Sequence, residues 1–363
     1  MAQPTMPSPD ESSYPPPFRR PTSPSAAVLG VPVAPPALPV SFSTVHIPVI
    51  DLQALDPGAL AAACEDWGVF RLTNHGTPPA LSRRLHDEVR RVFSLPFETK
   101  RARFAGPPAT YFFGTPAVSL VVRDLNWLEG IHVPLDRPPP CFPGGDPDLG
   151  EDACLRDLTE EYGRHSARVV KALFESLAAE IGFDGERRAS YLSDSDRMLR
   201  LFFYPHCPHP AGKYLGINAH TDSSVLTTVS EDEVGGLQVL RDGTWFSVKP
   251  VAGTLVVIVG DMLQAMSDDR CRSSEHRVLA SSGRERISIC YFAFPCEEGA
   301  IVSSKYRKFT NREFREKVQE DIRSVGFKYP IFTGGVDPIF TGGVVLRDKQ
   351  LVLDDTSPQI VTQ

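Results

Sequence analysis

The sequence places a histidine and an aspartate two positions apart, at His220 and Asp222, just before an apolar run. On an extended strand, residues i and i+2 project from the same face, so both side chains can hold one ion. A third ligand must come from elsewhere, and His276 stands at the start of another apolar segment. Two imidazoles and one carboxylate leave three positions of an octahedron open, whereas structural zinc sites are closed by four protein ligands.

An arginine and a serine follow the third ligand, at Arg286 and Ser288. In the segment 286–294 (RISICYFAF), alternate residues share one face, so both can point into the cavity that holds the metal. A guanidinium offers a bidentate fork for a carboxylate. Alone, an H-x-D pair is common by chance, and Arg286 could form an ordinary surface salt bridge. Together, these residues predict an Fe(2+) site with the dicarboxylate 2-oxoglutarate as co-substrate.

Short strands must position these residues. From residue 198 onward, short apolar runs alternate with turns, and Asp242-Gly243 is a strong hairpin signal. About seven short strands at this spacing predict a jelly roll or barrel. Thr310 and Glu313 form a capping-box pattern, which predicts a final helix to about residue 324. The first half predicts strands at 46–52 and 68–74 and helices at 55–67, 78–94 and 158–181.

This order divides the chain into four parts. We predict a Pro-rich disordered tail at 1–44, a helix-rich region at 45–195, the jelly-roll core with the final helix at 196–328, and a variable tail at 329–363. Residues 1–40 contain 12 of the 34 prolines. Because they hold few large apolar residues, burial cannot offset the entropy of ordering them.

Composition narrows the class of protein. The formal net charge is −7 without a long basic block, which argues against nucleic acid as a partner. No apolar run approaches the roughly 20 residues of a membrane span, and the N-terminus lacks the apolar core of a secretory signal. The seven cysteines include no C-x-x-C pair, which favours free thiols in a reducing compartment. We therefore expect a cytoplasmic protein, acting as a monomer on a small molecule.

These motifs, in this order, resemble the plant-type 2-oxoglutarate- and Fe(II)-dependent dioxygenases. The resemblance covers roughly residues 46–328 and includes WGVFRLTNHG at 67–76 and VGGLQVLRDGTW at 234–245. It implies a mainly β fold, a distorted double-stranded β-helix (jelly roll) with flanking helices. It also implies catalysis with Fe(2+), 2-oxoglutarate and O2, supported by ascorbate. By the same resemblance, Tyr204 reaches 2-oxoglutarate beside Arg286 and Ser288, and Phe292 faces the organic substrate.

Within that family the sequence is most similar to gibberellin 2-oxidases that act on twenty-carbon gibberellins. The segments that carry this similarity are NWLEGIHVPL at 126–135 and YRKFTNREFR at 306–315. It implies oxidation of a carboxylated gibberellin at C-2, which inactivates the hormone, with release of succinate and CO2. Candidate substrate contacts are Tyr111, Phe113, Trp127, Glu129, Phe292 and Phe294.

The family pattern is not complete around Trp127, where Asn126 and Leu128 replace the usual flanking serines. Oxidation of another gibberellin position, a flavonoid, an alkaloid or an auxin-like acid is the alternative. A non-catalytic ligand-binding homologue is a third hypothesis, and the intact metal and arginine motifs argue against it.

Overall fold

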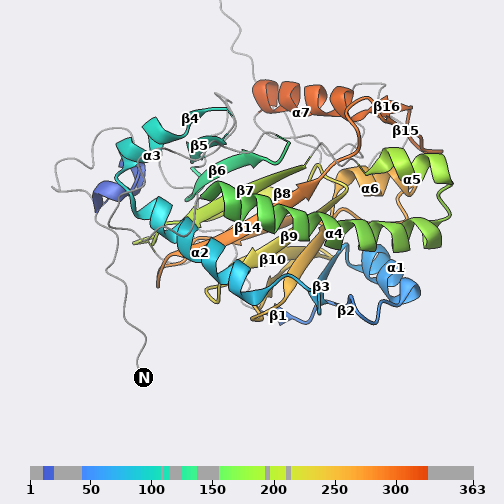
Figure 1. The fold of residues 1–363 in the computed structure, drawn as a ribbon, viewed down its shortest axis with the longest axis horizontal. Helices are drawn as coiled ribbons and strands as arrows, with labels where there is room; N and C mark the ends of the chain where they lie inside the picture. Colours follow the sequence, from blue (N-terminus) through green and yellow to red (C-terminus); the bar gives the residue numbers. More distant parts are fainter. Residues whose placement is uncertain are drawn as a thin grey trace, which may run out of the picture.

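The computed structural model of the protein describes residues 11–19, 43–107, 109–114, 125–136, 155–192, 197–209 and 214–325. The predicted tail at 329–363 lies outside the described residues. The described chain forms two facing sheets of mainly antiparallel strands, with helices packed on one of them (Figure 1). This arrangement confirms the predicted jelly roll with flanking helices.

The larger sheet has the strand order β2-β3-β12-β9-β14-β7-β6-β5-β4. Its strands are β2 (Val49–Asp51), β3 (Val69–Thr73), β12 (Leu255–Val259), β9 (Leu226–Glu231), β14 (Arg286–Ala293), β7 (Arg197–Tyr204), β6 (Glu129–Pro134), β5 (Ala109–Phe113) and β4 (Ala105–Gly106). The smaller sheet, in order, contains β1 (Thr44–Val45), β11 (Thr244–Val248), β10 (Leu237–Arg241), β13 (His276–Leu279) and β8 (Leu215–His220). A separate two-stranded pair joins β15 (Ala300–Ile301) to β16 (Phe309–Thr310).

The helices are α1 (Pro57–Asp66), α2 (Pro79–Ser94), α3 (Phe97–Arg103), α4 (Leu155–Ile181), α5 (Gly185–Tyr191), α6 (Asp261–Met266) and α7 (Asn311–Val325). Helices α2 and α4 lie across the larger sheet (Figure 1), and α4 buries residues at helical spacing, such as Tyr162, Val169 and Leu173. Thr310 caps α7 as predicted: its hydroxyl oxygen accepts a hydrogen bond from the N–H of Glu313, and the Glu313 carboxylate accepts one from the N–H of Thr310. Among the described helices, none is long and apolar enough to cross a membrane.

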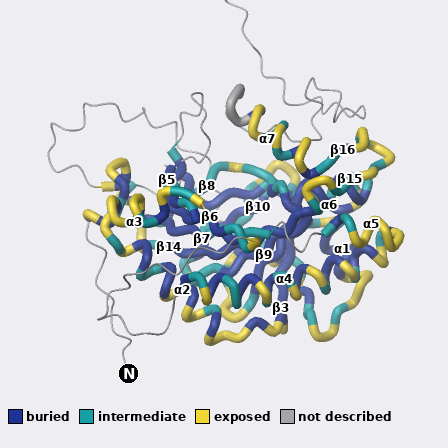
Figure 2. Tube along the Cα trace, turned by 45° about the horizontal axis from the view of Figure 1, so that its top comes forward, coloured by how far each residue is buried: buried dark blue, intermediate teal, exposed yellow. Residues whose placement is uncertain are grey.

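The larger sheet is buried on both faces. Its inner face packs against the smaller sheet, so Phe202 and Cys290 share a cluster with Val239 and Val278. Its outer face packs against the helices through the alternate residues, such as Ile289. Figure 2 shows the consequence: buried residues concentrate in the central strands, and exposed residues lie on α3 and α7. The terms inner face and outer face are used below in this sense.

The start of the chain differs from the predicted disordered tail. Two short 3-10 helices, η1 (Glu11–Ser13) and η2 (Pro16–Phe18), pack on the folded protein. Phe18 is buried with its ring 4.7 Å from the ring of Trp127, and the hydroxyl of Tyr14 donates to Glu285. These two aromatic side chains hold the segment on the folded protein, although its proline-rich composition predicts disorder. Residues 20–42 lie outside the described residues.

One glycine fixes the loop that carries Asp222. The N–H of Gly260 donates to the carbonyl of Val225 at 3.0 Å, and the N–H of Asp261 donates to the carbonyl of Asp222 at 2.8 Å. A Cβ at Gly260 would lie 1.9 Å from the carbonyl oxygen of Ser224, so a side chain there must push two backbone segments apart. This close approach holds the Asp222 loop against the start of α6.

We therefore expect Gly260→Ala to destabilise the protein by about 1–3 kcal/mol, the usual cost of overpacking a well-packed site. Urea unfolding followed by circular dichroism measures this loss. Gly185→Ala is the matched control, because a Cβ at Gly185 meets open space. Equal midpoints for the two variants would contradict the close-packing argument.

Candidate metal centre and co-substrate pocket

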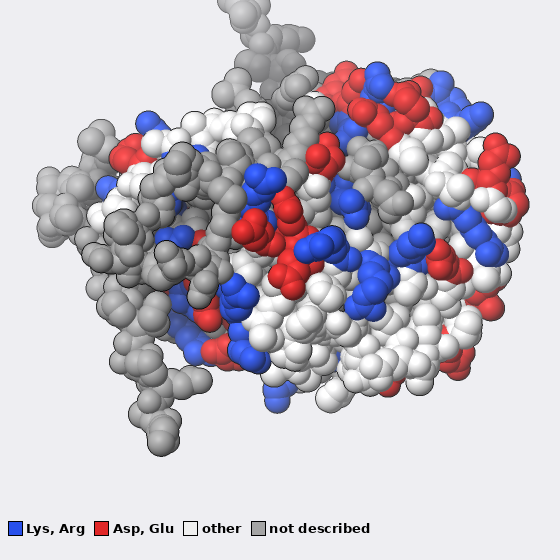
Figure 3. Space-filling view, viewed as in Figure 1, with Lys and Arg blue, Asp and Glu red and all other residues white. Residues whose placement is uncertain are grey.

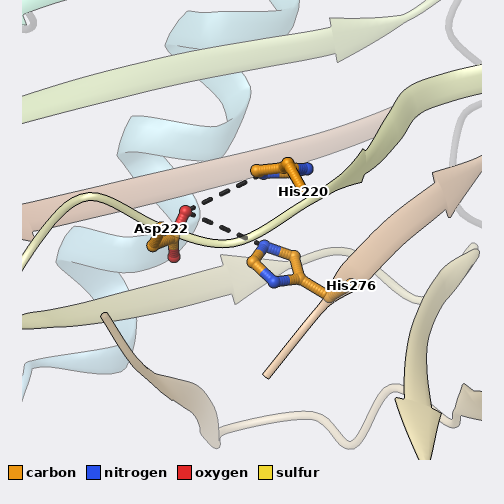
Figure 4. Close-up of side chains that lie close together, drawn as sticks. All are labelled: His220, Asp222 and His276. Carbon is orange, nitrogen blue, oxygen red and sulfur yellow. Dashed lines mark ion pairs between the residues drawn. The ribbon is translucent and has the colours of Figure 1, made fainter. Parts of the chain in front are cut away.

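Three predicted ligands converge where β8 ends and β13 begins. His220 and His276 are paired across the two strands, and their ring centroids lie 4.3 Å apart. Each Nε2 atom is 3.8 Å from Oδ1 of Asp222 (Figure 4), and the ligand atoms all lie within 4.8 Å of one another. Asp222 and His276 are buried and His220 is half-buried. The fold thus brings together the residues that the spacing predicted.

Backbone carbonyls orient both imidazoles. Nδ1 of His220 donates to the carbonyl of Asn218 at 2.8 Å, and Nδ1 of His276 donates to the carbonyl of Ser274 at 3.0 Å. A proton held on Nδ1 leaves the Nε2 lone pair directed at the centre of the group. Two neutral nitrogen donors and one carboxylate suit a divalent mid-row transition metal such as Fe(2+). The donor set therefore fits the metal that the sequence predicts.

Arg286, Ser288 and Tyr204 meet on the inner face beside the metal centre. Nη1 of Arg286 donates to Oγ of Ser288 at 3.1 Å, and this hydroxyl lies 3.5 Å from that of Tyr204. The guanidinium carbon lies 4.8 Å from the centroid of the Tyr204 ring. Arg286 is only 1% exposed, and its Nε has no hydrogen-bond partner within the described residues. A buried guanidinium with a spare donor fits the far carboxylate of 2-oxoglutarate.

The sequence analysis missed Glu231, which is already paired with this arginine. Nη2 of Arg286 lies 2.8 Å from Oε2 of Glu231, at the end of the neighbouring strand β9. Burial works to lower the pKa of Arg286, but Tyr204 and the Glu231 carboxylate outweigh it, so the pKa lies above its ordinary value. The guanidinium therefore stays charged. In the sequence Glu231 is only the first of three consecutive acidic residues that follow the strand segment LTTVS.

A second basic residue, Arg200, was also missed. It lies on the inner face of β7, paired with Cys290 of β14 and with His132 of β6. Its guanidinium carbon lies 5.4 Å from the centroid of the Phe292 ring. Burial lowers the pKa of Arg200, and the Asp222 carboxylate opposes that shift. Arg200 thus places a cation on the same side of the sheet as the metal ligands.

Two of the six candidate substrate contacts belong to the inner face, and a third packs in a separate group. Phe292 and Phe294 belong to the inner apolar cluster. Trp127 instead packs in a separate aromatic group with Phe18, and its ring lies 5.3 Å from that of Tyr214. The remaining three candidates lie elsewhere.

Tyr111, Phe113 and Glu129 lie on the outer face, away from the metal ligands. The register pairs Glu129 with Phe203 and Tyr111 with Ile131, and all four side chains belong to the helix-covered side. Because successive side chains alternate, Phe112 takes the inner position in β5. The expectation that these three line the substrate cavity therefore does not fit their placement.

Glu129 instead forms a buried polar network. Lys100 of α3 and Glu129 are both 0% exposed and form an ion pair, and the hydroxyl of Tyr111 donates to Glu129 at 2.5 Å. Lys100 also donates to the carbonyl of Phe93 at 3.0 Å. Burial raises the pKa of Glu129 to about 7, and the neighbouring Lys100 and Tyr111 limit that rise. This network ties α3 to the sheet.

Comparison with known proteins assigns this geometry to a family. The profile of the 2OG-Fe(II) oxygenase superfamily (2OG, 2-oxoglutarate) matches residues 195–295, and one described as non-haem dioxygenase in morphine synthesis N-terminal matches residues 47–150. Gibberellin 2-beta-dioxygenase 6 of Oryza sativa subsp. japonica is 37% identical over 78% of this chain and 83% of its own length. Gibberellin 2-beta-dioxygenase 8 of Arabidopsis thaliana is 34% identical over 80% and 89%.

Solved structures share the fold. A crystal structure of JOX2 in complex with 2OG, Fe and JA aligns with a TM-score of 0.68 at 27% identity, covering 84% of this chain and 94% of that one. The dioxygenase for auxin oxidation in rice aligns with a TM-score of 0.62 at 27% identity, covering 77% and 97%. The jelly roll described above is thus the fold of known 2OG oxygenases.

Proposed function

We propose that this chain, which belongs to the 2OG-Fe(II) oxygenase superfamily, oxidises a gibberellin at C-2. The chain is a dioxygenase that uses Fe(2+), 2-oxoglutarate and O2. The gibberellin assignment is supported by relatives named gibberellin 2-beta-dioxygenase at 34–37% identity. Inactivation of the hormone would be the biological result.

In this proposal each part of the site has one task. His220, Asp222 and His276 hold the iron, and Arg286, Ser288 and Tyr204 hold the far carboxylate of 2-oxoglutarate. Bound Fe(2+) supplies the activation of O2 that couples decarboxylation of 2-oxoglutarate, to succinate and CO2, with hydroxylation of the substrate. The apolar inner face, including Phe292, excludes water and orients the reactants. Ascorbate keeps the iron reduced.

The position of Arg200 is the observation that favours an acidic substrate. It is a cation of the inner face, separate from Arg286, and lies beside Phe292. In the part of the chain that the structure describes, the guanidinium of Arg200 has no carboxylate within salt-bridge distance and no hydrogen bond, although the Asp222 carboxylate acts on its pKa. A half-buried guanidinium of this kind is stabilised by an anionic ligand. The carboxylate of a gibberellin supplies one.

Incubation with Fe(2+), ascorbate, 2-oxoglutarate and a panel of gibberellins tests the proposal. We expect consumption of a gibberellin acid in step with succinate release, and little consumption of its methyl ester. Arg200→Gln is expected to lower kcat/KM for the acid by roughly 10–100-fold, the usual loss of a hydrogen bond to a charged group. The ester should respond little to this substitution. Succinate release without gibberellin consumption would contradict the gibberellin assignment.

A second candidate is another small plant acid. It is favoured by the shared fold with JOX2 in complex with JA and with the dioxygenase for auxin oxidation. The same assay with a panel of these acids separates the two candidates, since the preferred substrate shows the highest kcat/KM.

A cytosolic location and a monomeric state are further predictions. Fluorescence imaging of a tagged chain checks the location, and size-exclusion chromatography checks the oligomeric state.

Nucleic acid is not among the proposed partners. On the face that Figure 3 presents, basic and acidic side chains are interspersed, and the basic ones do not form a continuous patch. The formal net charge of −7 agrees with this distribution.

A further inference from the structure

We propose that Glu231 is a positioning residue for Arg286, and that its negative charge limits the affinity of the pocket for 2-oxoglutarate. The proposal rests on the role of Arg286 in the proposed function. In this proposal, a residue of the chain itself weakens the binding of the co-substrate. The argument starts from the geometry of the pair.

Glu231 and Arg286 form a buried pair on the inner face. Glu231 is directly opposite Ser288 in the ladder between β9 and β14, so both side chains point to the same side of the sheet. Oε2 of Glu231 lies 2.8 Å from Nη2 of Arg286, and the two side chains are 5% and 1% exposed. The carboxylate therefore occupies one donor edge of the guanidinium that is expected to receive 2-oxoglutarate.

Both partners keep an unused polar atom. Oε1 of Glu231 and Nε of Arg286 are buried and have no hydrogen-bond partner among the described residues. Nη1 of the arginine is held by Ser288 at 3.1 Å. The guanidinium thus has room for a second carboxylate, but that carboxylate must lie close to the first.

The surrounding groups balance this second negative charge only in part. Asp232 adds another carboxylate nearby, where it accepts a hydrogen bond from the N–H of Ile287 at 2.7 Å. Burial lowers the pKa of Arg71 and the Glu231 carboxylate opposes that shift, so this cation lies near Glu231. It offsets the negative charge only in part, because its guanidinium donates to Thr254 Oγ1 at 2.9 Å and to the carbonyl of Lys249. Burial lowers the pKa of His86 to about 4, so this imidazole is neutral. Like charges in a buried site repel strongly, because little water screens them.

The pair also indicates what Glu231 contributes to the site. A buried arginine without a counter-ion is costly, and the carboxylate stabilises it and fixes its plane before the co-substrate arrives. The same charge then opposes the far carboxylate of 2-oxoglutarate. Glu231 therefore lowers the affinity for 2-oxoglutarate, but it holds Arg286 in the geometry that binds this co-substrate. This effect is specific to ligands that carry the far carboxylate.

Glu231→Gln tests the charge, because the amide keeps an oxygen for Nη2 of Arg286. We expect anaerobic calorimetry of the Fe(2+)-loaded protein to show about tenfold tighter binding of 2-oxoglutarate. Binding of 2-oxobutanoate, which lacks the far carboxylate, should not change. Glu233→Gln is the matched control, because Glu233 pairs with Arg284 at the surface at 3.0 Å and leaves Arg286 alone. This control should bind 2-oxoglutarate like the unmodified protein.

Unchanged or weaker binding of 2-oxoglutarate by Glu231→Gln would overturn the inference, as would an equal change for both acids. Circular dichroism establishes that each variant is folded, and Glu231→Asp, which retains the charge, should not show the tightening. The proposed function fails on a different result. If the unmodified protein binds 2-oxoglutarate and oxidises a gibberellin, that function stands whatever the variant shows.

Discussion

Replacement of His276 by alanine is expected to lower Fe(2+) binding and dioxygenase activity by more than about 100-fold. Even the loss of an outer-shell partner of a metal ligand typically costs about 10–100-fold, and His276 is placed to contact the metal itself. Its Nε2 lies 3.8 Å from Oδ1 of Asp222, and its ring is fixed by the carbonyl of Ser274. With only His220 and Asp222 left, the site keeps two ligands. Metal content after gel filtration, and succinate release, measure the two effects.

His165→Ala on α4 is the matched control, since it removes an imidazole from the helix layer. It should bind iron and release succinate like the unmodified protein. His220→Ala should behave like His276→Ala. Retention of stoichiometric iron by either of these ligand variants, in a folded protein, would show that the metal has other ligands.

Lys100→Met is expected to have the second large effect, on stability. It removes the cation that pairs with Glu129. Because both side chains are 0% exposed, this leaves a buried carboxylate without its counter-ion. Breaking a buried pair in this way costs about 3–5 kcal/mol. For a chain of this size the loss corresponds to a decrease in Tm of roughly 10 °C. Thermal unfolding followed by circular dichroism at pH 8 measures it.

The pH dependence follows from the pKa of Glu129, which burial raises from 4.5 to about 7. In this window the folded state binds more protons at Glu129 than the unfolded state. The contribution of this group to stability is therefore greatest at low pH and is lost as the pH rises towards 7. Lys100→Met should thus destabilise the protein less at pH 5 than at pH 8.

The double variant Lys100→Met, Glu129→Gln is the control for a charge effect. It removes both charges and should recover a large part of the stability that Lys100→Met loses, because an uncharged buried pair needs no counter-ion. If the double variant is as unstable as the two single losses added together, the ion pair does not account for the effect.

The sequence predicted which side chains come together at the candidate metal centre, His220, Asp222 and His276. Arg286 and Ser288 share the inner face because of strand alternation. Asp222 instead follows the end of β8 at His220, and its loop is held against the start of α6. A single charge in an apolar run was present at Arg200, in MLRLFFY at 198–204. Glu231 opens the acidic run EDE at 231–233, so nothing in the pattern separates it from its exposed neighbour Glu233.

Other placements could not be derived from the pattern. The segment ATYFF at 109–113 is apolar on both faces, since the larger sheet is buried on both sides. Nothing in such a run indicates which residues point inward, and a shift of one position exchanges Phe112 with Phe113. The anchoring of the N-terminus was hidden for a different reason. Two aromatic residues, Tyr14 and Phe18, hold a segment whose average composition predicts disorder.

The two faces of β14 have a consequence for how this protein evolves. Arg286, Ser288 and Phe292 occupy one register of the strand, and Ile287 and Ile289 occupy the other. A substitution in the first register changes the groups that face the site, whereas one in the second changes only the packing against the helices. Because every residue of β14 is buried, both kinds of change also alter the stability of the fold. New substrate preferences on this strand therefore come with a cost in stability.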